Sequence, residues 1–358
     1  MRRLQNGGCE QRIMNEIKSR FLRACHRLPV DATPVWFMRQ AGRYMAEYRA
    51  IREKFTLLEM VERPEIAAEV TLQPVEALGV DAAILFADIL LPVVPMGFNL
   101  KFVKGEGPRI DNPFRTEEDL KRIQKINAVT DLGHVMEAIK ILREELSDEV
   151  ALIGFSGAPF TVASYIIEGG PSKEYHHVKS LMYAYPEVWG EFISLVADTL
   201  TDYLVSQIDA GAQAVQVFDS WVGVLCPSDY QQYVLPYSRK MIQAAKAKDV
   251  PVIHFGTNTT TLLPLMKEAG SDVIGLDWRI PLDEGWKLLG EDLAVQGNLD
   301  PIALFSPRDV LEEKVKDVLD RADGRPGHIF NLGHGISRFT NPDQVKTVVE
   351  MVHDWTAK

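Results

Sequence analysis

The chain has 358 residues, of which 46% are hydrophobic and 25% charged, and its formal net charge is −11. This length allows one large α/β domain or two smaller ones, and the composition is that of a globular protein with a sizeable core. The negative charge argues against nonspecific nucleic-acid binding, and no apolar run reaches the roughly 18 to 20 residues that span a bilayer. An anionic substrate would need a local basic pocket, because the overall field would repel it.

The cysteines and the first residues bear on the compartment. Cys9, Cys25 and Cys226 show no paired spacing, so we expect no disulfide framework. Residues 1–12 are polar and lack the hydrophobic segment of a signal peptide. We therefore expect a cytoplasmic protein in which residues 1–12 are disordered. No repeat, linker or low-complexity tract divides residues 13–358, which we expect to form a single catalytic domain.

Helical patterns and short apolar segments alternate along the chain. The predicted helices span 13–27, 47–60, 64–78 and 116–145, followed by a helical region over 159–209 that breaks near 169–171 and at 186. The predicted strands span 35–38, 82–87, 151–155, 214–218, 252–255, 273–276, 293–296 and 329–332. Eight strands with helical patterns in most of the gaps predict an α/β fold of the (β/α)₈ TIM-barrel type. An open doubly wound sheet is the alternative, which periodicity alone leaves open.

Polar residues stand just past the ends of most predicted strands. They are Arg39, Asp88, Ser156, Ser220, Asp277, Asn298 and His334. In a barrel the carboxyl ends of the strands meet at one mouth, where such enzymes carry their chemistry. This placement favours the barrel over the open sheet.

The stretch from Pro34 to Arg49 contains a candidate anion site. Arg39 and Arg43 are four residues apart on either side of Gly42, which would let the backbone turn and aim both side chains at one place. Each guanidinium offers a planar fork that matches carboxylate or phosphate oxygens. The alternative is two surface arginines in ion pairs, but their position after a buried strand favours the anion site.

Asp88 is the second candidate, since it lies between a buried strand and three apolar residues, 89–91. A carboxylate in such surroundings is unfavourable unless it is paired with a cation or meets donors from a ligand. A salt bridge to a neighbouring arginine is the structural alternative. His334, Ser220 and Tyr165 also have structural alternatives: an oriented core imidazole, a helix N-cap and a core tyrosine.

Cofactor and metal motifs are weak in this sequence. Residues 333–338, GHGISR, resemble half of a dinucleotide fingerprint but lack its third glycine. The backbone N–H groups of Gly333 and Gly335 leave a phosphate site as an alternative. No His-Glu-x-x-His, His-x-Cys or Cys-x-x-Cys pattern occurs, so we predict no metal centre.

Two long motifs give the chain a family resemblance. Residues 34–44, PVWFMRQAGRY, and 154–170, GFSGAPFTVASYIIEGG, resemble the two signatures of the uroporphyrinogen decarboxylase family. FADIL, FDSWVG, GLDW, QGNLDP and NLGHGI follow in the family's order, so the resemblance runs from about Pro34 to Ile336. Three departures occur: Ala87 replaces a frequent Ser, Phe160 replaces a frequent Trp, and ISRFTNPDQ from residue 336 replaces a commoner Pro-containing loop.

The resemblance implies a distorted (β/α)₈ barrel, commonly a homodimer, that uses neither metal nor organic cofactor. It implies removal of carbon dioxide from the four acetate side chains of uroporphyrinogen III, giving coproporphyrinogen III in haem and chlorophyll synthesis. The substrate-binding residues expected from it are Arg39, Gln40, Ala41, Arg43, Asp88, Tyr165, Phe218, Ser220 and His334. The catalytic candidates are Asp88, Arg39, Tyr165 and His334.

The reaction gives these residue types a chemical reason. Loss of carbon dioxide from a pyrrole acetate would leave an unstabilised carbanion, whereas prior protonation of the ring creates an electron sink. Asp88 would accept pyrrole N–H groups and stabilise the developing cation. Arg39 and Arg43 would bind substrate carboxylates. Because arginine has a pKa above about 12, Tyr165, His334 or a bound water is a chemically easier proton donor than Arg39.

Two other functions remain as alternatives. A cofactor-dependent methyltransferase can share this barrel, but it would need thiolate and imidazole zinc ligands that the sequence does not offer. A noncatalytic tetrapyrrole carrier would bind a similar ligand in the same place, and only the full set of polar residues at the strand ends argues against it.

Overall fold

The structure is a computed structural model that describes residues 17–103, 106–290 and 292–358. Its first helix, α2, spans Arg20–Cys25, so the helix predicted over 13–27 is shorter within the described residues. Ser19 accepts a hydrogen bond from the N–H of Leu22 and caps this helix. The expected disorder of residues 1–12 lies outside the described residues.

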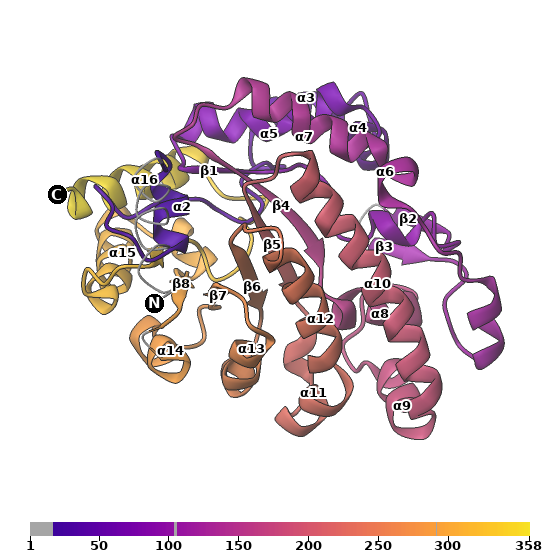
Figure 1. Cartoon of the computed structure of the whole chain (residues 1–358). Coiled ribbons are helices and arrows are strands. Elements are labelled where there is room, and N and C mark those ends of the chain that lie inside the picture. Colours follow the sequence, from indigo (N-terminus) through magenta and orange to yellow (C-terminus); the bar gives the residue numbers. More distant parts are fainter. Residues whose placement is uncertain (1–16, 104–105, 291) are drawn as a thin grey trace, which may run out of the picture.

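Seven parallel strands form one curled sheet in the order β1-β4-β5-β6-β7-β8-β9 (Figure 1). The strands are β1 (Ala82–Ile84), β4 (Ala151–Gly157), β5 (Ala214–Asp219), β6 (Val252–Gly256), β7 (Val273–Gly275), β8 (Ala294–Gln296) and β9 (His328–Ile329). Each strand pairs with the next one in this order, as repeated strand-helix units require. The α/β class and seven of the predicted strands are therefore confirmed.

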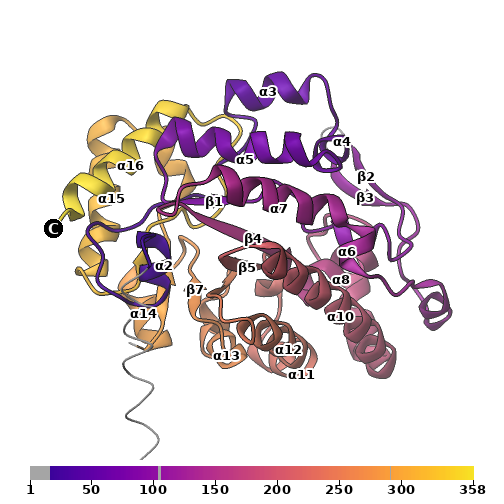
Figure 2. The same cartoon turned by 45° about the horizontal axis from the view of Figure 1, so that its top comes forward.

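Helices surround this sheet in both views (Figures 1 and 2). They are α3 (Ala46–Arg52), α4 (Leu57–Val61), α5 (Pro64–Leu78), α6 (Ala128–Asp131), α7 (Gly133–Glu145), α8 (Pro159–Glu168), α9 (His176–Ala184), α10 (Pro186–Ala210), α11 (Pro227–Tyr233), α12 (Leu235–Lys246), α13 (Leu263–Ala269), α14 (Leu282–Leu289), α15 (Arg308–Ala322) and α16 (Pro342–Thr356). Short 3₁₀ turns occur at Leu91–Val93, Glu117–Arg122, Val222–Val224, Thr260–Leu262 and Pro301–Phe305. In the described part of the chain, none of the helices combines the length and apolar character that crossing a bilayer demands.

The segment predicted as the strand over 35–38 is fully buried but irregular. Val35 forms a single parallel bridge to Phe330, and the N–H of Phe330 donates to the carbonyl of Pro34 at 2.9 Å. On the other side, the N–H of Asp81 donates to the carbonyl of Val35 at 2.8 Å. The segment therefore lies between β9 and the start of β1, the two edges of the sheet.

Local signals explain where several helices begin and end. The predicted helix over 47–60 divides into α3 and α4 because Thr56 and Glu59 form a capping box that starts a new helix. The helix α5 spans Pro64–Leu78, as predicted, and Gly79 caps it with a left-handed φ of 71°. Likewise, α8 ends at Gly169 with a φ of 83°.

One prediction for the region after β1 was wrong, and one element there was missed. Residues 116–145 are not one helix: a 3₁₀ turn, α6 and α7 share this stretch, and an extended residue, Ile123, ends the first of them. An antiparallel hairpin, β2 (Leu100–Val103) and β3 (Gly107–Ile110), was not predicted. Its strands alternate little in hydrophobicity and are half-exposed, so no two-residue period marked them.

Candidate active site

The predicted site residues lie at the carboxyl end of the parallel sheet. Arg39 follows the segment 35–38, Asp88 follows β1, and His334 follows β9. Phe218 is the second-to-last residue of β5 and Ser220 follows that strand, while Tyr165 lies on α8, the helix after β4. Because all these strands run parallel, their polar ends share one rim of the sheet.

The loop that carries Arg39 is held by Gln40. The Gln40 side chain is fully buried; its Oε1 accepts from the N–H of Phe37 at 3.0 Å and its Nε2 donates to the carbonyl of Ala82 at 3.0 Å. Arg39 itself has a φ of 61°, a left-handed conformation that is unfavourable for a residue with a side chain. Gln40 therefore ties a strained turn to β1, and its side-chain atoms are engaged within the protein.

Gly42 has a different role from the one predicted. It does not adopt a positive φ; the left-handed residue of this loop is Arg39. A Cβ at Gly42 would lie 3.1 Å from the Arg39 carbonyl, so the glycine permits a close approach within the loop. Ala41 is half-buried beside it. Arg43 is exposed, and its charge acts on Tyr48 rather than on the residues around Asp88.

Asp88 is half-buried, and within the described residues its carboxylate makes no ion pair. The N–H of Leu90 donates to its Oδ1 at 2.9 Å. Burial raises the pKa of Asp88 to about 6, against the opposing effects of the Leu90 N–H and of the Arg39 charge. The salt bridge considered as its structural role is thus not formed, and Oδ2 is left for another donor.

Aromatic rings line the side of the site near Asp88. Tyr165 stacks on Trp221 with ring centroids 3.6 Å apart, and Tyr175 meets the same indole edge-on at 5.3 Å. Burial, then the Asp88 and Tyr175 charges, raise the pKa of Tyr165, while the Arg39 charge opposes the shift. The fully buried hydroxyl of Tyr203 on α10 has no hydrogen-bond partner in the described structure, and its pKa is raised by burial first and then by the Asp88 charge.

A side chain on α8 holds the turn after β5 in place. Thr161 on α8 donates its hydroxyl hydrogen to Oδ1 of the buried Asp219 at 2.9 Å and accepts from the N–H of Trp221 at 3.2 Å. Phe218 is half-buried, with its ring 5.5 Å from that of Phe155. Ser220 follows Asp219 and is half-buried. One helix thus positions both Tyr165 and the indole on which it stacks.

His334 stands between two glycines that make room for neighbouring groups. A Cβ at Gly333 would lie 2.3 Å from the backbone nitrogen of Trp278, and one at Gly335 would lie 2.4 Å from Cδ of Arg39. Burial, together with the charges of Arg39 and Arg279, lowers the pKa of His334 to about 4, against the opposing charge of Asp277. The imidazole is therefore neutral at physiological pH.

Gly335→Ala is expected to lower kcat/KM about tenfold with a small loss of thermal stability, because the added methyl group would push the flexible Arg39 side chain aside. Gly333→Ala is the matched comparison: its methyl group would meet the backbone of Trp278, so we expect mainly a loss of stability. Melting temperature and steady-state kinetics of both variants check this. Equal kinetic and thermal effects in the two variants would contradict the assigned contacts.

Three residues outside this cluster bring potential metal-ligand atoms close together. Ligand atoms of Glu168, His176 and His177 lie within 4.8 Å of one another, a grouping that the spacing patterns did not predict. However, Oε1 of Glu168 already accepts the N–H of Val178 at 2.9 Å. The positive charge of Arg115 also acts on His177 and would oppose a bound cation. These surroundings argue against a metal there.

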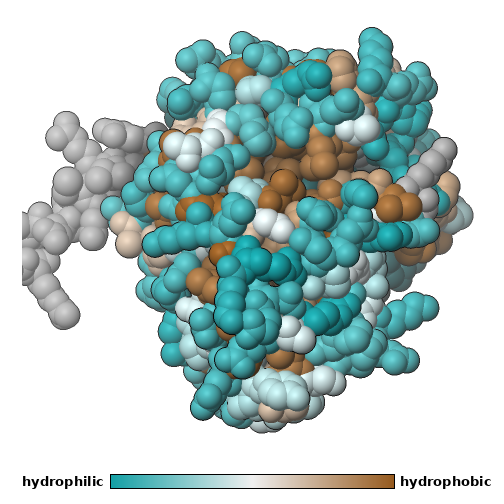
Figure 3. Space-filling model, turned by 90° about the vertical axis from the view of Figure 1, so that its right-hand side faces the viewer, coloured by the Kyte–Doolittle hydropathy of each residue, from teal (hydrophilic) through white to brown (hydrophobic). Residues whose placement is uncertain are grey.

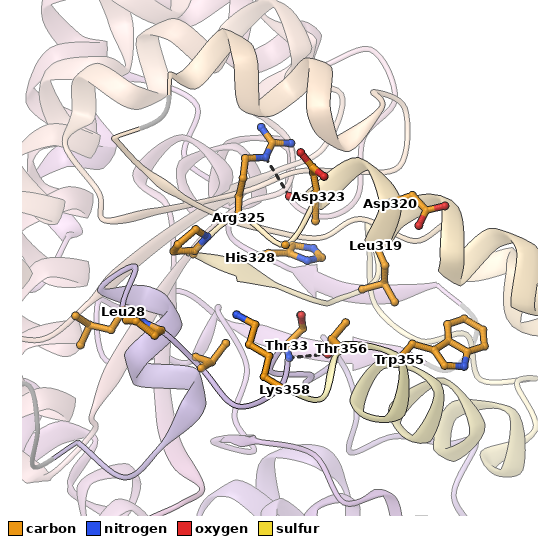
Figure 4. Close-up of a pocket in the computed structure, with 16 residues that line it drawn as sticks. Leu28, Thr33, Leu319, Asp320, Asp323, Arg325, His328, Trp355, Thr356 and Lys358 are labelled. Carbon is orange, nitrogen blue, oxygen red and sulfur yellow. Dashed lines mark hydrogen bonds between the residues drawn. The ribbon is translucent and has the colours of Figure 1, made fainter.

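A cavity of about 680 Å³ lies at the opposite end of the sheet (Figure 4). Its lining includes Leu28, Thr33, Arg325, His328 and Lys358, which lie before the segment 35–38, before or at the start of β9, or just after α16. The figure shows Arg325 and Asp323 on one side of it and Thr33 and Lys358 on the other. None of the predicted site residues lines this cavity. On the face of the molecule shown in Figure 3, hydrophobic side chains gather in a hollow that hydrophilic side chains surround.

The chain is similar to known proteins over nearly its whole length. Residues 16–355 match the family model described as uroporphyrinogen decarboxylase (URO-D). The chain is 58% identical to a uroporphyrinogen decarboxylase from Carboxydothermus hydrogenoformans over 334 residues. The aligned residues make up 93% of this chain and 95% of that protein. A uroporphyrinogen decarboxylase from Geobacter metallireducens is 52% identical over 342 residues, 96% of this chain and 100% of that protein.

Solved structures show a similar fold. A methyltransferase from Methanosarcina mazei superposes with a TM-score of 0.81 at 21% identity, over 95% of this chain and 98% of the other. A B12-independent methionine synthase from a Shewanella species has a TM-score of 0.56 at 11% identity, over 82% of this chain and 88% of the other. At such identities the likeness concerns the fold alone.

Proposed function

The chain belongs to the uroporphyrinogen decarboxylase family, and we propose that the residues at the carboxyl end of its sheet decarboxylate the acetate side chains of uroporphyrinogen III to give coproporphyrinogen III. The protein is accordingly a carboxy-lyase of tetrapyrrole biosynthesis. The observation that carries this assignment of the site is Asp88, a half-buried carboxylate without an ion pair among the described residues.

Asp88 fits the charge that the reaction develops. Protonation of a pyrrole ring before loss of carbon dioxide makes the ring cationic, and the electrons left by carbon dioxide then flow into that ring. A carboxylate that accepts the pyrrole N–H groups binds the cation more tightly than the neutral ring, which lowers the barrier. Leu90 fixes one oxygen of Asp88, so the acceptor is already oriented before substrate arrives.

The other residues divide between carboxylate binding and proton transfer. Arg39 reaches the neighbourhood of Asp88, Tyr165 and His334, and its guanidinium supplies the cation that a substrate carboxylate needs. Arg43 lies on the outer part of the same loop and would bind a more peripheral carboxylate. Gln40 holds this loop in place through its side chain, and Ala41 beside it would contact the substrate. Ser220 and Phe218 would contact the macrocycle beside Trp221.

The surroundings of each candidate donor bear on proton delivery. His334 is neutral, so it does not carry an acidic proton at physiological pH, although its ring can orient a water molecule. Tyr165 keeps its hydroxyl proton because its pKa is raised. Because the raised pKa also makes the Tyr165 hydroxyl a weaker acid, a water oriented by His334 suits proton delivery better than Tyr165 does, and Arg39 acts first through its charge.

The proposal extends to the fold and assembly. Hydrogen bonds from Phe330 and Asp81 to either side of the segment 34–35 support a (β/α)₈ barrel that this segment closes. The resemblance supports one catalytic domain, a homodimer and a bacterial-type cytoplasmic enzyme that needs no cofactor. Sedimentation of the purified protein tests the dimer.

The proposed activity is tested by anaerobic incubation with uroporphyrinogen III, with and without prior dialysis against a strong chelator. Chromatography of the oxidised products should show species with seven, six and five carboxyl groups and then coproporphyrin, unchanged by the chelator. Bound but unconverted substrate would instead identify a tetrapyrrole carrier. Activity that is lost on dialysis and restored by zinc would favour metal-dependent chemistry.

A further inference from the structure

Arg279 is a cation at the rim of the site that the sequence analysis did not select. It follows Trp278 on the loop after β7, and its guanidinium stacks over the Trp278 ring at 3.9 Å. The Trp278 ring in turn meets the His334 ring edge-on, with centroids 6.3 Å apart. The close approach of Trp278 to Gly333 fixes this loop against the residues around His334.

The position of Arg279 is held by a buried carboxylate. Asp277 is 2% exposed; its Oδ2 accepts from Nη1 of Arg279 at 2.7 Å and its Oδ1 accepts from the Arg279 N–H at 2.9 Å. The backbone of Asp277 is tied down as well, since Nδ2 of Asn298 donates to its carbonyl at 2.9 Å. The Trp278 ring and the Asp277 carboxylate together restrict the side chain from two sides.

Most of the hydrogen-bonding capacity of Arg279 is unused. A guanidinium carries five N–H groups. Among the described residues, Nη1 is the only guanidinium atom of Arg279 with a hydrogen-bond partner, and the side chain is 44% exposed. A restrained arginine with free donors is suited to a carboxylate, because little rotational freedom is lost when the carboxylate binds.

The substrate supplies more carboxylates than the predicted residues can bind. Uroporphyrinogen carries eight, whereas the sequence analysis identified two arginines, Arg39 and Arg43, on a single loop. Arg39 and Arg279 both act on the His334 ring, so they lie on different elements around the same residue. A macrocycle seated between Asp88 and His334 would direct some of its carboxylates toward the loop after β7.

We propose that Arg279 binds a carboxylate side chain of the tetrapyrrole beside His334, and that Asp277 and Trp278 hold its guanidinium in place for this contact. The inference rests on the proposed function, because it takes uroporphyrinogen as the ligand. Arg279 is thus a third substrate-binding arginine, separate from the loop that carries Arg39.

The test compares three variants in the anaerobic uroporphyrinogen assay. Arg279→Gln should raise KM about tenfold with kcat changed less than about twofold, since a half-exposed contact to a charged group falls at the low end of the usual range. Arg279→Lys keeps the charge but loses the planar fork and should raise KM by an intermediate factor. Arg325→Gln is the matched control, because Arg325 also stacks on a tryptophan, Trp286, but at the opposite end of the sheet.

The expected pattern is a raised KM only in the Arg279 variants, with a similar loss of melting temperature in Arg279→Gln and Arg325→Gln. An unchanged KM in Arg279→Gln, or an equal rise in Arg325→Gln, would overturn the inference and leave Arg279 a structural residue. If the wild-type protein converts no uroporphyrinogen, the proposed function fails first. Normal wild-type turnover with an unchanged KM in Arg279→Gln rejects the inference alone.

Discussion

Asp88→Asn is expected to lower the single-turnover rate of decarboxylation by roughly 10²- to 10³-fold, by analogy with the removal of one preorganised group that stabilises charge in a transition state. The amide keeps the shape of the carboxylate but loses the negative charge that answers the pyrrole cation. Its NH₂ group would also face the pyrrole donors, so some loss of substrate binding should accompany the slower step. Asp88→Glu retains the charge but displaces it by one methylene, for which we expect about a 10²-fold loss.

The thermal stability of Asp88→Asn should not fall together with its activity. Burial raises the pKa of Asp88 to about 6, above its usual value of 3.8, so the folded protein holds the proton more tightly than the unfolded chain. The stability gained from that proton is complete below pH 3.8 and is lost as the pH rises through 6. At pH 8 the Asn variant should therefore melt at the same temperature as the wild type or higher, and any advantage should fade below about pH 5.

Measuring the melting temperature and the single-turnover rate on one sample separates the two accounts of Asp88. A carboxylate retained for catalysis predicts a stable, slow variant. A residue retained for structure predicts a variant that unfolds more easily while its folded fraction reacts at a nearly normal rate. The second result would remove Asp88 from the reaction.

Arg39→Lys is expected to lower kcat/KM by about 10²-fold although the charge is conserved, because misplacing a group by about 1 Å has effects of that size. The ammonium cannot form the planar fork, and it cannot bind a carboxylate through two parallel N–H groups. The backbone strain at Arg39 is the same for lysine, so the melting temperature should change little.

Arg43→Lys is the comparison for this variant. Arg43 is exposed and lies outside the group formed by Asp88, Tyr165 and His334, so its variant should lose less activity than Arg39→Lys. Steady-state kinetics with uroporphyrinogen measure both. Wild-type kinetics in Arg39→Lys would remove Arg39 from the residues that bind the substrate.

The strands could be predicted from the sequence because their signal is local. Runs such as residues 151–155 and 252–255 are apolar on both faces, as a buried parallel strand requires. The segment 35–38 shows the limit of this signal: it is as apolar as the others, yet it forms only one bridge to Phe330. The segment pairs with residues next to β9 and β1, which are far from it in the chain, and the composition of the segment does not reveal such pairing. The hairpin β2–β3 has half-exposed strands and gave no comparable pattern.

The site could be predicted in part for a similar reason. Asp88 stands out because apolar neighbours surround it in the sequence, and its raised pKa has the same cause. The left-handed turn at Arg39 depends on Gln40 reaching Ala82, a contact 42 residues away in the chain. The stacking of Trp221 on Tyr165 and the position of Arg279 likewise require tertiary structure. Their only sequence signal is that Trp221 and Trp278 belong to motifs that carry the family resemblance.

The most direct test of the account is the pH dependence of kcat/KM for the wild type and for Asp88→Asn. If the reaction needs the Asp88 carboxylate, the wild-type value should fall below about pH 6, where Asp88 takes up a proton. His334 does not account for that limb, because its pKa lies at about 4. The Asn variant should show a lower rate with no decrease near pH 6. The same acid limb in both proteins would contradict the assignment of Asp88 as the charge that stabilises the pyrrole cation.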